Sequence, residues 1–110
     1  MAAFTELVIE QGATFNTTLN VSDTNGDAIN LYAYTANSQM RKSYYSSSAT
    51  TIRTAVTGIA NGEITLSITA ANTASISAGR YVFDVKITSP NQEVSRVVEG
   101  IATVLPSVTR

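Results

Sequence analysis

The sequence contains no cysteine, no histidine and no tryptophan. Without cysteine the chain has no disulfide framework and no thiolate nucleophile. Without histidine it lacks the commonest metal ligand and the side chain that most often acts as a general base near neutral pH. We therefore expect no metal, no cofactor and no enzyme activity.

Charge is also scarce, since charged residues make up 14% of the chain against roughly a quarter in a typical soluble domain. Seven Lys and Arg face eight Asp and Glu, which leaves a formal net charge of -1. Nucleic acids and anionic membranes attract strongly basic surfaces, so neither is an expected partner. A weakly charged surface is, however, easily desolvated against another protein.

No run of apolar residues reaches the roughly 18 needed to span a membrane. Residues 1–6 also lack the basic region and apolar stretch of a secretory signal. The expectation is therefore a protein made in a cytoplasm that reaches any later location by assembly.

Apolar residues alternate with polar ones in three stretches, 15–22, 63–69 and 81–88. A period of two is typical of β-strands with one buried face. The residues expected to point inward are Phe15, Thr17, Leu19, Val21, Ile64, Leu66, Ile68, Tyr81, Phe83, Val85 and Ile87. Further strands are expected near 6–10, 32–42, 50–57 and 94–104, with Tyr34, Ala36 and Met40 inward in the second of these.

Turn signals separate these stretches at 23–27, at 58–62 and at 89–92, where a four-residue hairpin loop is expected. A chain of 110 residues has room for one core. The sequence thus predicts an all-β fold, a two-layer antiparallel immunoglobulin-like β-sandwich of about seven strands, with residues 1–110 forming a single domain.

One segment, 69–76, has the composition of a short helix rather than a strand, and Thr69 is suited to be its N-cap. It lies between the fifth and sixth expected strands and leads into Gly79 and Tyr81. This order resembles the tyrosine corner of immunoglobulin-like sandwiches, in which the tyrosine hydroxyl bonds a backbone group just upstream. Gly79 would supply a positive φ before the strand.

The last expected strand has an inconsistent phase, because Arg96 and Glu99 are three residues apart and cannot both face solvent in a regular strand. A β-bulge near Val97 and Val98, or at Gly100, would resolve this. Pro106 should end the strand. Residues 106–110 are then either a frayed end or a short docking arm.

Two motifs admit a chemical interpretation but have a simpler one. Asp23, Asn25 and Asp27 have the opening spacing of a calcium loop, but a helical calcium loop needs glycine and an acidic residue where Ala28 and Tyr34 stand. A hairpin turn explains the segment. Residues 40–45 combine cations with aromatics, as single-strand nucleic-acid binders do. We favour the simpler interpretation, the end of a strand whose two tyrosines anchor a protein interface.

Other signals are weaker still. The sequons at Asn16 and Asn20 are interpreted as polar outer positions of a strand. The acidic residues are scattered over strand faces and turns, and no phosphate-binding loop or nucleophile elbow is present. No catalytic, cofactor-binding or metal-binding residue is therefore assigned.

Four stretches, taken together, resemble a family: 7–15 (LVIEQGATF), 34–41 (YTANSQMR), 62–85 (from GEITLSITAANT to AGRYVFDV) and 96–110 (from RVVEGIATV to VTR). They are similar to short immunoglobulin-like virion structural proteins of tailed bacteriophages, including those that infect cyanobacteria, and to modules of phage baseplates. The resemblance covers nearly the whole chain. It implies a virion location, no catalysis, and partners that are other virion proteins, with self-association in a symmetric assembly.

The leading hypothesis is a capsid decoration (cement) protein that binds the major capsid protein in the assembled head. A neck, tail or baseplate component is the alternative within the same class. A third hypothesis, from another class, is a carbohydrate-binding module for host attachment that would use Tyr32, Tyr44 and Tyr45. The residues expected to make contacts are Phe4, Tyr44, Tyr45, Val108 and Arg110.

Overall fold

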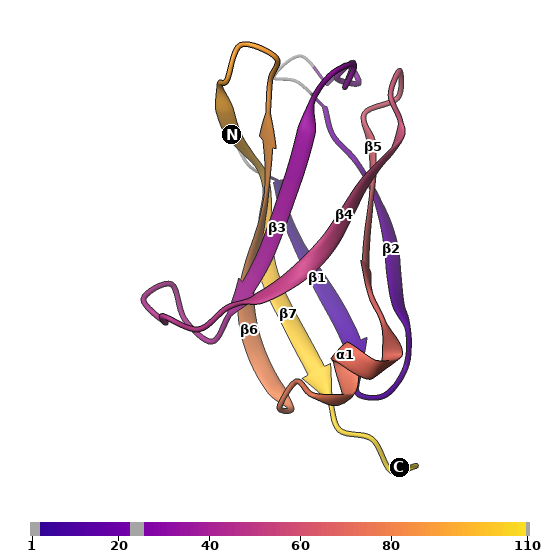
Figure 1. The fold of residues 1–110 in the computed structure, drawn as a ribbon, viewed down its shortest axis with the longest axis vertical. Coiled ribbons are helices and arrows are strands. Elements are labelled where there is room, and N and C mark those ends of the chain that lie inside the picture. The colour runs from indigo at the N-terminus through magenta and orange to yellow at the C-terminus, as the bar shows by residue number, and fades with distance from the viewer. Residues whose placement is uncertain (1–2, 23–25, 110) are drawn as a thin grey trace.

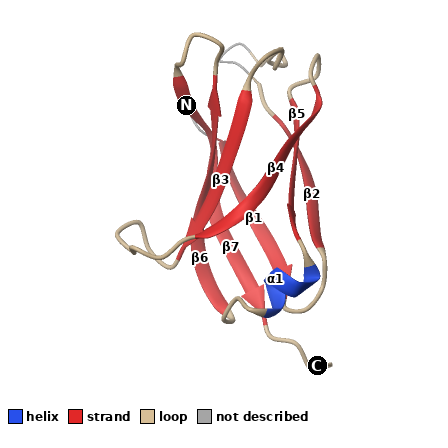
Figure 2. Cartoon of the chain, in the orientation of Figure 1, coloured by secondary structure: helices blue, strands red, loops and turns tan. Residues whose placement is uncertain are grey.

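The computed structural model describes residues 3–22 and 26–109, which form seven strands and one short helix (Figures 1 and 2). The predicted all-β class, with about seven strands, is confirmed within this part of the chain. In sequence order the elements are β1 (Ala3–Glu10), β2 (Phe15–Asn20), β3 (Thr35–Arg41), β4 (Thr50–Gly58), β5 (Glu63–Ile68), α1 (Ala70–Ala74), β6 (Gly79–Thr88) and β7 (Val94–Leu105).

The strands form one mixed sheet in the order β1-β7-β6-β3-β4-β5-β2. Its continuity depends on β4, whose beginning pairs with β3 and whose remainder pairs with β5. The sheet curls around the core until it is nearly barrel-shaped (Figure 1). Its two edge strands, β1 and β2, are joined by residues 11–14, and both line one hollow there.

One pair of strands departs from the predicted antiparallel arrangement. β1 and β7 run parallel, with Ala3 opposite Val98 and Glu10 opposite Leu105. Alternation of side chains is the same in parallel and antiparallel strands, so the sequence pattern carries no information about direction. The other strand pairs are antiparallel.

The core is built from the inward side chains that the period of two predicts. On β5, Ile64, Leu66 and Ile68 are all buried, and Phe83, Val85 and Ile87 on β6 are buried in the same cluster. Burial of apolar surface stabilises the fold by about 25 cal/mol for each Å² removed from water. The remaining buried apolar residues are Leu7, Ile9, Val21, Leu31, Met40, Ile52, Ile76, Val98, Ala102 and Val104.

Two boundaries differ from the prediction. β3 begins at Thr35 rather than near Tyr32, because a turn closes before it: the Tyr34 N–H donates to the Leu31 carbonyl, and Ala33 between them has a φ of 61°. The loop between β6 and β7 has five residues instead of four, and the Ser89 N–H donates to the Glu93 carbonyl across it.

The helical turn and the tyrosine corner are confirmed. Thr69 is the N-cap of α1, and its side chain accepts a hydrogen bond from the Asn72 N–H at 3.3 Å. The Tyr81 hydroxyl donates to the Ser77 carbonyl at 2.7 Å. Gly79 between them has a φ of 144°, a conformation that side-chain-bearing residues rarely adopt.

The predicted bulge in the last strand is also confirmed. Val85 of β6 pairs with Val98 of β7, but the next residue, Lys86, pairs with Arg96, so Val97 is the extra residue. Gly100 is instead regularly paired, opposite Phe83. Because the bulge changes the phase, Arg96 and Glu99 lie on the same outer face. In the described part of the chain, no helix has the length and apolar content to cross a membrane.

Candidate functional site

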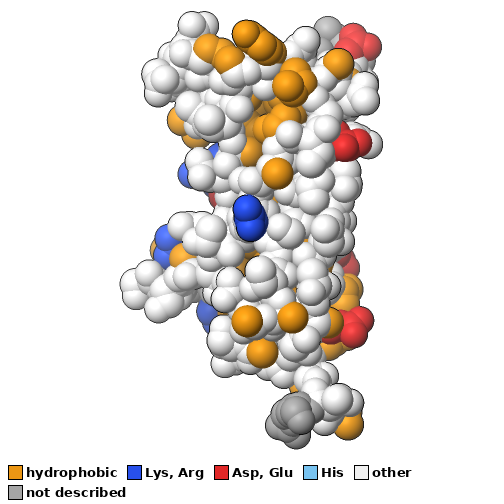
Figure 3. Space-filling model, turned by 45° about the vertical axis from the view of Figure 1, so that its right-hand side comes forward, with side chains coloured by type: hydrophobic (Ala, Val, Ile, Leu, Met, Phe, Trp, Pro, Cys, Tyr) orange, Lys and Arg blue, Asp and Glu red, His pale blue; other side chains and the backbone are white. Residues whose placement is uncertain are grey.

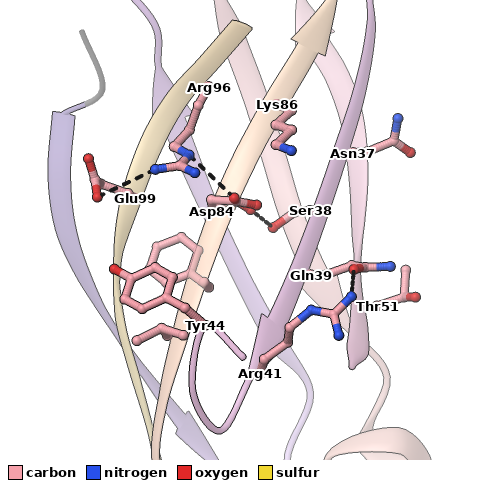
Figure 4. A pocket seen from close by; sticks show the side chains of 12 residues that line it. Asn37, Ser38, Gln39, Arg41, Tyr44, Thr51, Asp84, Lys86, Arg96 and Glu99 are labelled. Carbon is pink, nitrogen blue, oxygen red and sulfur yellow. Dashed lines mark hydrogen bonds and ion pairs between the residues drawn. The ribbon is translucent and has the colours of Figure 1, made fainter. Parts of the chain in front are cut away.

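A groove of about 460 Å³ lies on the outer face of β3, β6 and β7, and the β3–β4 loop stands beside it (Figure 4). Its lining is mostly polar, with Tyr44 as the aromatic side chain exposed at its rim. The lining residues are Asn37, Ser38, Gln39, Arg41, Tyr44, Thr51, Val82, Phe83, Asp84, Lys86, Arg96 and Glu99.

The groove floor consists of two rows of polar side chains that cross the strands. Gln39 pairs with Asp84, and Asp84 pairs with Glu99, so these three side chains lie next to one another on β3, β6 and β7. Directly opposite residues in a sheet place their side chains on the same face about 5 Å apart. The second row is Asn37, Lys86 and Arg96, assembled in the same way.

Ion pairs connect the two rows. Arg96 Nε lies 3.4 Å from Asp84 Oδ2, and Arg96 Nη1 lies 3.9 Å from Glu99 Oε1. The bulge at Val97 makes this possible, since it brings Arg96 and Glu99 to one face. Two carboxylates therefore share one guanidinium, and a bound molecule would meet both acceptors and donors on the groove floor (Figure 4).

The loop beside the groove is held by Arg41. Its Nη1 donates to the Ser46 carbonyl at 2.7 Å, and its Nη2 donates to Gln39 Oε1 at 3.2 Å. The Ser46 N–H in turn donates to the Ser43 carbonyl. This arrangement fixes the turn that carries Tyr44 and Tyr45, and it directs Tyr44 over the groove (Figure 4).

The structure brings some of the predicted contact residues to one side and not others. Phe4 pairs with Glu99, and Glu99 lines the groove together with Tyr44. Phe4, Tyr44 and Tyr45 are exposed by 64%, 66% and 98%. We call the groove, taken together with these three exposed side chains, the groove face.

Val108 belongs to a different region. It is 94% exposed in the segment after β7. The preceding residue is tied to the body, because the Ser107 N–H donates to Gln11 Oε1 at 3.2 Å. Arg110, the other residue assigned to this arm, lies outside the described residues, as do Asp23 and Asn25 of the calcium motif.

Tyr32 lies at the far end of β3 from Tyr44 and Tyr45. The seven residues of β3 separate them, a length of about 23 Å. The residue before Tyr32 is joined to the β4–β5 turn, since the Leu31 N–H donates to the Ile59 carbonyl, and exposed apolar side chains gather at this end of the molecule (Figure 3). The three tyrosines do not form a single platform.

The groove residues Asp84, Arg96 and Glu99 were not predicted as a group from the sequence. The available signal was the phase of the last strand, which placed Arg96 and Glu99 together on the outer face. The pairing with Asp84 depends on the register between β6 and β7, which alternation alone does not give. Among the described residues, no group of three or more acidic side chains gathers in an arrangement suited to a metal ion.

No family model and no curated protein matches the chain. Among solved structures, it is similar to the Listeria monocytogenes internalin-like protein lmo2027 (19% identity, TM-score 0.49), over 94% of this chain and 28% of that one. It is also similar to a family 123 glycoside hydrolase from Clostridium perfringens (13% identity, TM-score 0.43), over 97% of this chain and 24% of that one. The chain thus spans about a quarter of the length of either.

Proposed function

We propose that this chain is a non-enzymatic structural protein of a tailed-phage virion, most specifically a decoration protein that binds assembled capsid subunits. The observation that carries the proposal is the exposure of large apolar side chains on a small body, at the groove face and in the segment after β7. Tyr45 and Val108 are almost fully exposed, and Phe4 and Tyr44 are about two-thirds exposed. Aromatic side chains presented in this way are typical anchors of protein interfaces.

The dimensions of the molecule support the same function. The chain measures 43 × 28 × 22 Å and exposes 6872 Å². A standard protein interface takes about 800 Å² from each partner. Two or three such contacts would engage roughly a quarter to a third of this surface, and a protein of this shape can therefore bridge neighbouring subunits.

The finer fold assignment belongs to this proposal as well. We infer an immunoglobulin-like sandwich in which β1, β7, β6 and β3 form one layer and β2, β5 and the end of β4 form the other. Three features support it: the tyrosine corner at Tyr81, the core between the strands, and the change of partner along β4.

A decoration protein acts by mass action. Because it binds the assembled shell and not free subunits, its binding free energy adds to the stability of the shell. In a symmetric particle the same contact is repeated at every equivalent position, so copy number reports location. A neck, tail or baseplate component would use the same exposed side chains at far fewer positions.

The test is the copy number of this protein in purified particles of a phage that encodes it, measured by quantitative mass spectrometry against the major capsid protein. A ratio near one, or a simple fraction of one, supports decoration. About a dozen copies per particle would place the protein in the neck, tail or baseplate. Its absence from the particles would overturn the virion assignment altogether.

A second candidate function, binding of host carbohydrate, is favoured by the groove itself. The Tyr44 ring lines the same groove as Asn37, Gln39 and the Arg96 ion pairs, a combination that offers an apolar surface together with donors and acceptors for sugar hydroxyls. A glycan array tests it, with Tyr44→Ala as the variant and Tyr32→Ala as the control. Binding that Tyr44→Ala abolishes and Tyr32→Ala preserves would support this function, and an empty array would exclude it.

A further inference from the structure

The edge strand β2 has an inner face that its neighbours cover only in part. β2 pairs with β5 on one side and is the last strand of the sheet on the other. Its inward residues Phe15, Thr17 and Leu19 are only half-buried. Their register partners on β5 are Ile68, Leu66 and Ile64, all of which are buried to 3% exposure or less. One further strand beside β2 would complete the burial.

Space for such a strand exists beside the beginning of β2. A hollow of about 390 Å³ lies there between β2 and β1, lined by Phe15, Asn16 and Thr17 of β2 and by β1 residues that include Glu6 and Glu10. On this side β2 has no hydrogen-bonded strand among the described residues. A strand laid against it would make main-chain hydrogen bonds to the sheet, the usual mode of strand addition.

β2 also lacks the features that normally protect an exposed edge. Natural sheets guard their edges with charged side chains, proline or bulges. The sequence of β2, FNTTLN, contains no charged residue, no proline and no glycine, and its pairing with β5 is regular. Its outward side chains Asn16, Thr18 and Asn20 are exposed and uncharged. The opposite edge strand, β1, by contrast carries the exposed carboxylates Glu6 and Glu10.

We propose that β2 is a self-association site at which two copies of this chain pair edge to edge, antiparallel, about a two-fold axis through Thr17. This inference concerns the isolated protein and goes beyond the proposed virion function. In this register Phe15 lies opposite Leu19 of the second copy, so the half-covered apolar side chains cover one another. Asn16 lies opposite Thr18 of the second copy, and β2 itself brings no charged residue to the seam.

Charge selects β2 over β1 for this pairing. The corresponding antiparallel pairing of β1 about Val8 would set Glu6 opposite Glu10 of the second copy, and would do so twice. Like charges directly opposite one another destabilise a strand pair. A symmetric β2 pair also closes on itself, whereas pairing of β2 with β1 of another copy would continue as a ring or a filament.

The experiment uses the full chain and measures its mass by sedimentation equilibrium from low-micromolar to millimolar concentration. Two double variants introduce like charges into the seam: Asn16→Lys with Thr18→Lys, and Asn16→Glu with Thr18→Glu. Each should weaken the dimer about tenfold or more, because both cross-strand pairs become repulsive. An equimolar mixture of the two double variants should dimerise again, since every seam pair then joins opposite charges.

Two further variants serve as controls. Thr51→Lys with Ala55→Lys adds the same charge to exposed positions of the interior strand β4 and should leave the dimer unchanged. Asn16→Lys alone adds one seam charge and retains the Thr18 hydroxyl, which lies 3.3 Å from the Thr65 hydroxyl in the wild type. It should weaken the dimer less than the double variant.

Three outcomes would overturn the proposal. The first is a wild-type protein that remains monomeric at millimolar concentration. The second is a dimer that the seam variants leave intact or that their mixture fails to restore. The third is growth into species larger than a dimer, which would indicate head-to-tail pairing of β2 with β1 instead. None of these outcomes depends on whether the protein is found in a virion.

Discussion

Thr73 Oγ1 accepts a hydrogen bond from the Gly12 N–H at 3.1 Å, although the two residues are 61 positions apart. The same oxygen lies 2.8 Å from the Ala13 carbonyl, and the Thr73 side chain is fully buried. Through it, α1 holds the turn between the two edge strands and closes this end of the core. A buried backbone group that loses its partner costs about 1–3 kcal/mol.

Thr73→Val should therefore lower the free energy of unfolding by about 1–3 kcal/mol, because the methyl group keeps the volume but leaves the Gly12 N–H without an acceptor. Chemical denaturation of both proteins measures the difference. Ser75→Ala is the matched control, since the Ser75 hydroxyl donates to the Asn72 carbonyl at an exposed site, and it should change stability by less than about 0.5 kcal/mol. Equal losses in the two variants would contradict the bridging role.

Tyr81→Phe should lower the free energy of unfolding by about 1 kcal/mol, the usual net contribution of one hydrogen bond. It removes the hydroxyl that bonds the Ser77 carbonyl but keeps the ring, over which Lys42 Nζ lies at 4.8 Å. Thermal unfolding measures the change, and Lys42→Met separates the contribution of the cation. If Tyr81→Phe proves as stable as the wild type, the tyrosine corner is not a stabilising feature here.

Local patterns gave correct predictions for this chain where the structure is determined locally. The inward faces of β2, β5 and β6, the N-cap at Thr69 and the bulge at Val97 each depend on residues within a few positions of one another. The parallel direction of β1 against β7 was not predictable from the sequence, because alternation is the same for either direction. The candidate site was predictable only in part: Phe4, Tyr44 and Tyr45 stand out as apolar residues near strand ends, whereas the ion pairs of Arg96 require a register between strands.

Gly100→Ala should displace β1 from β7. A Cβ built at Gly100 would overlap the carbonyl oxygen of Thr5, its register partner on β1, and would lie 3.1 Å from Phe83 Cε1. Backbone in a paired strand cannot move aside without breaking the ladder, so we expect a loss of about 1–3 kcal/mol in the free energy of unfolding. Hydrogen exchange should show the loss of protection concentrated in β1.

Thr103→Ala is the control variant for Gly100→Ala, because it alters an outer-face position on the same strand, opposite Val8. It should leave exchange in β1 close to that of the wild type. Uniformly raised exchange over all strands of the Gly100→Ala variant would argue against a specific effect on β1.

The ion pairs of Arg96 should contribute little to stability. The Arg96 side chain is 45% exposed and that of Asp84 is 32% exposed, so water and salt screen their attraction. A double-mutant cycle with Arg96→Met and Asp84→Asn should give a coupling of less than about 1 kcal/mol, falling as salt is added. A larger coupling that is insensitive to salt would mean that the pair stabilises the strands themselves, and would weaken its interpretation as part of a binding groove.

Tyr45→Ala tests the groove face as an interface without disturbing the fold. The side chain is 98% exposed, so its removal should change the free energy of unfolding by less than about 0.5 kcal/mol. An aromatic anchor that becomes buried on binding costs more than about 1 kcal/mol when truncated, or roughly fivefold in affinity. Binding to phage particles that lack this protein, measured by co-sedimentation, should fall by at least that factor. Tyr32→Ala, which alters the segment before β3, should bind as the wild type does, because Tyr32 lies outside the groove face. A loss of binding in Tyr32→Ala but not in Tyr45→Ala would transfer the interface to the Tyr32 end of the molecule.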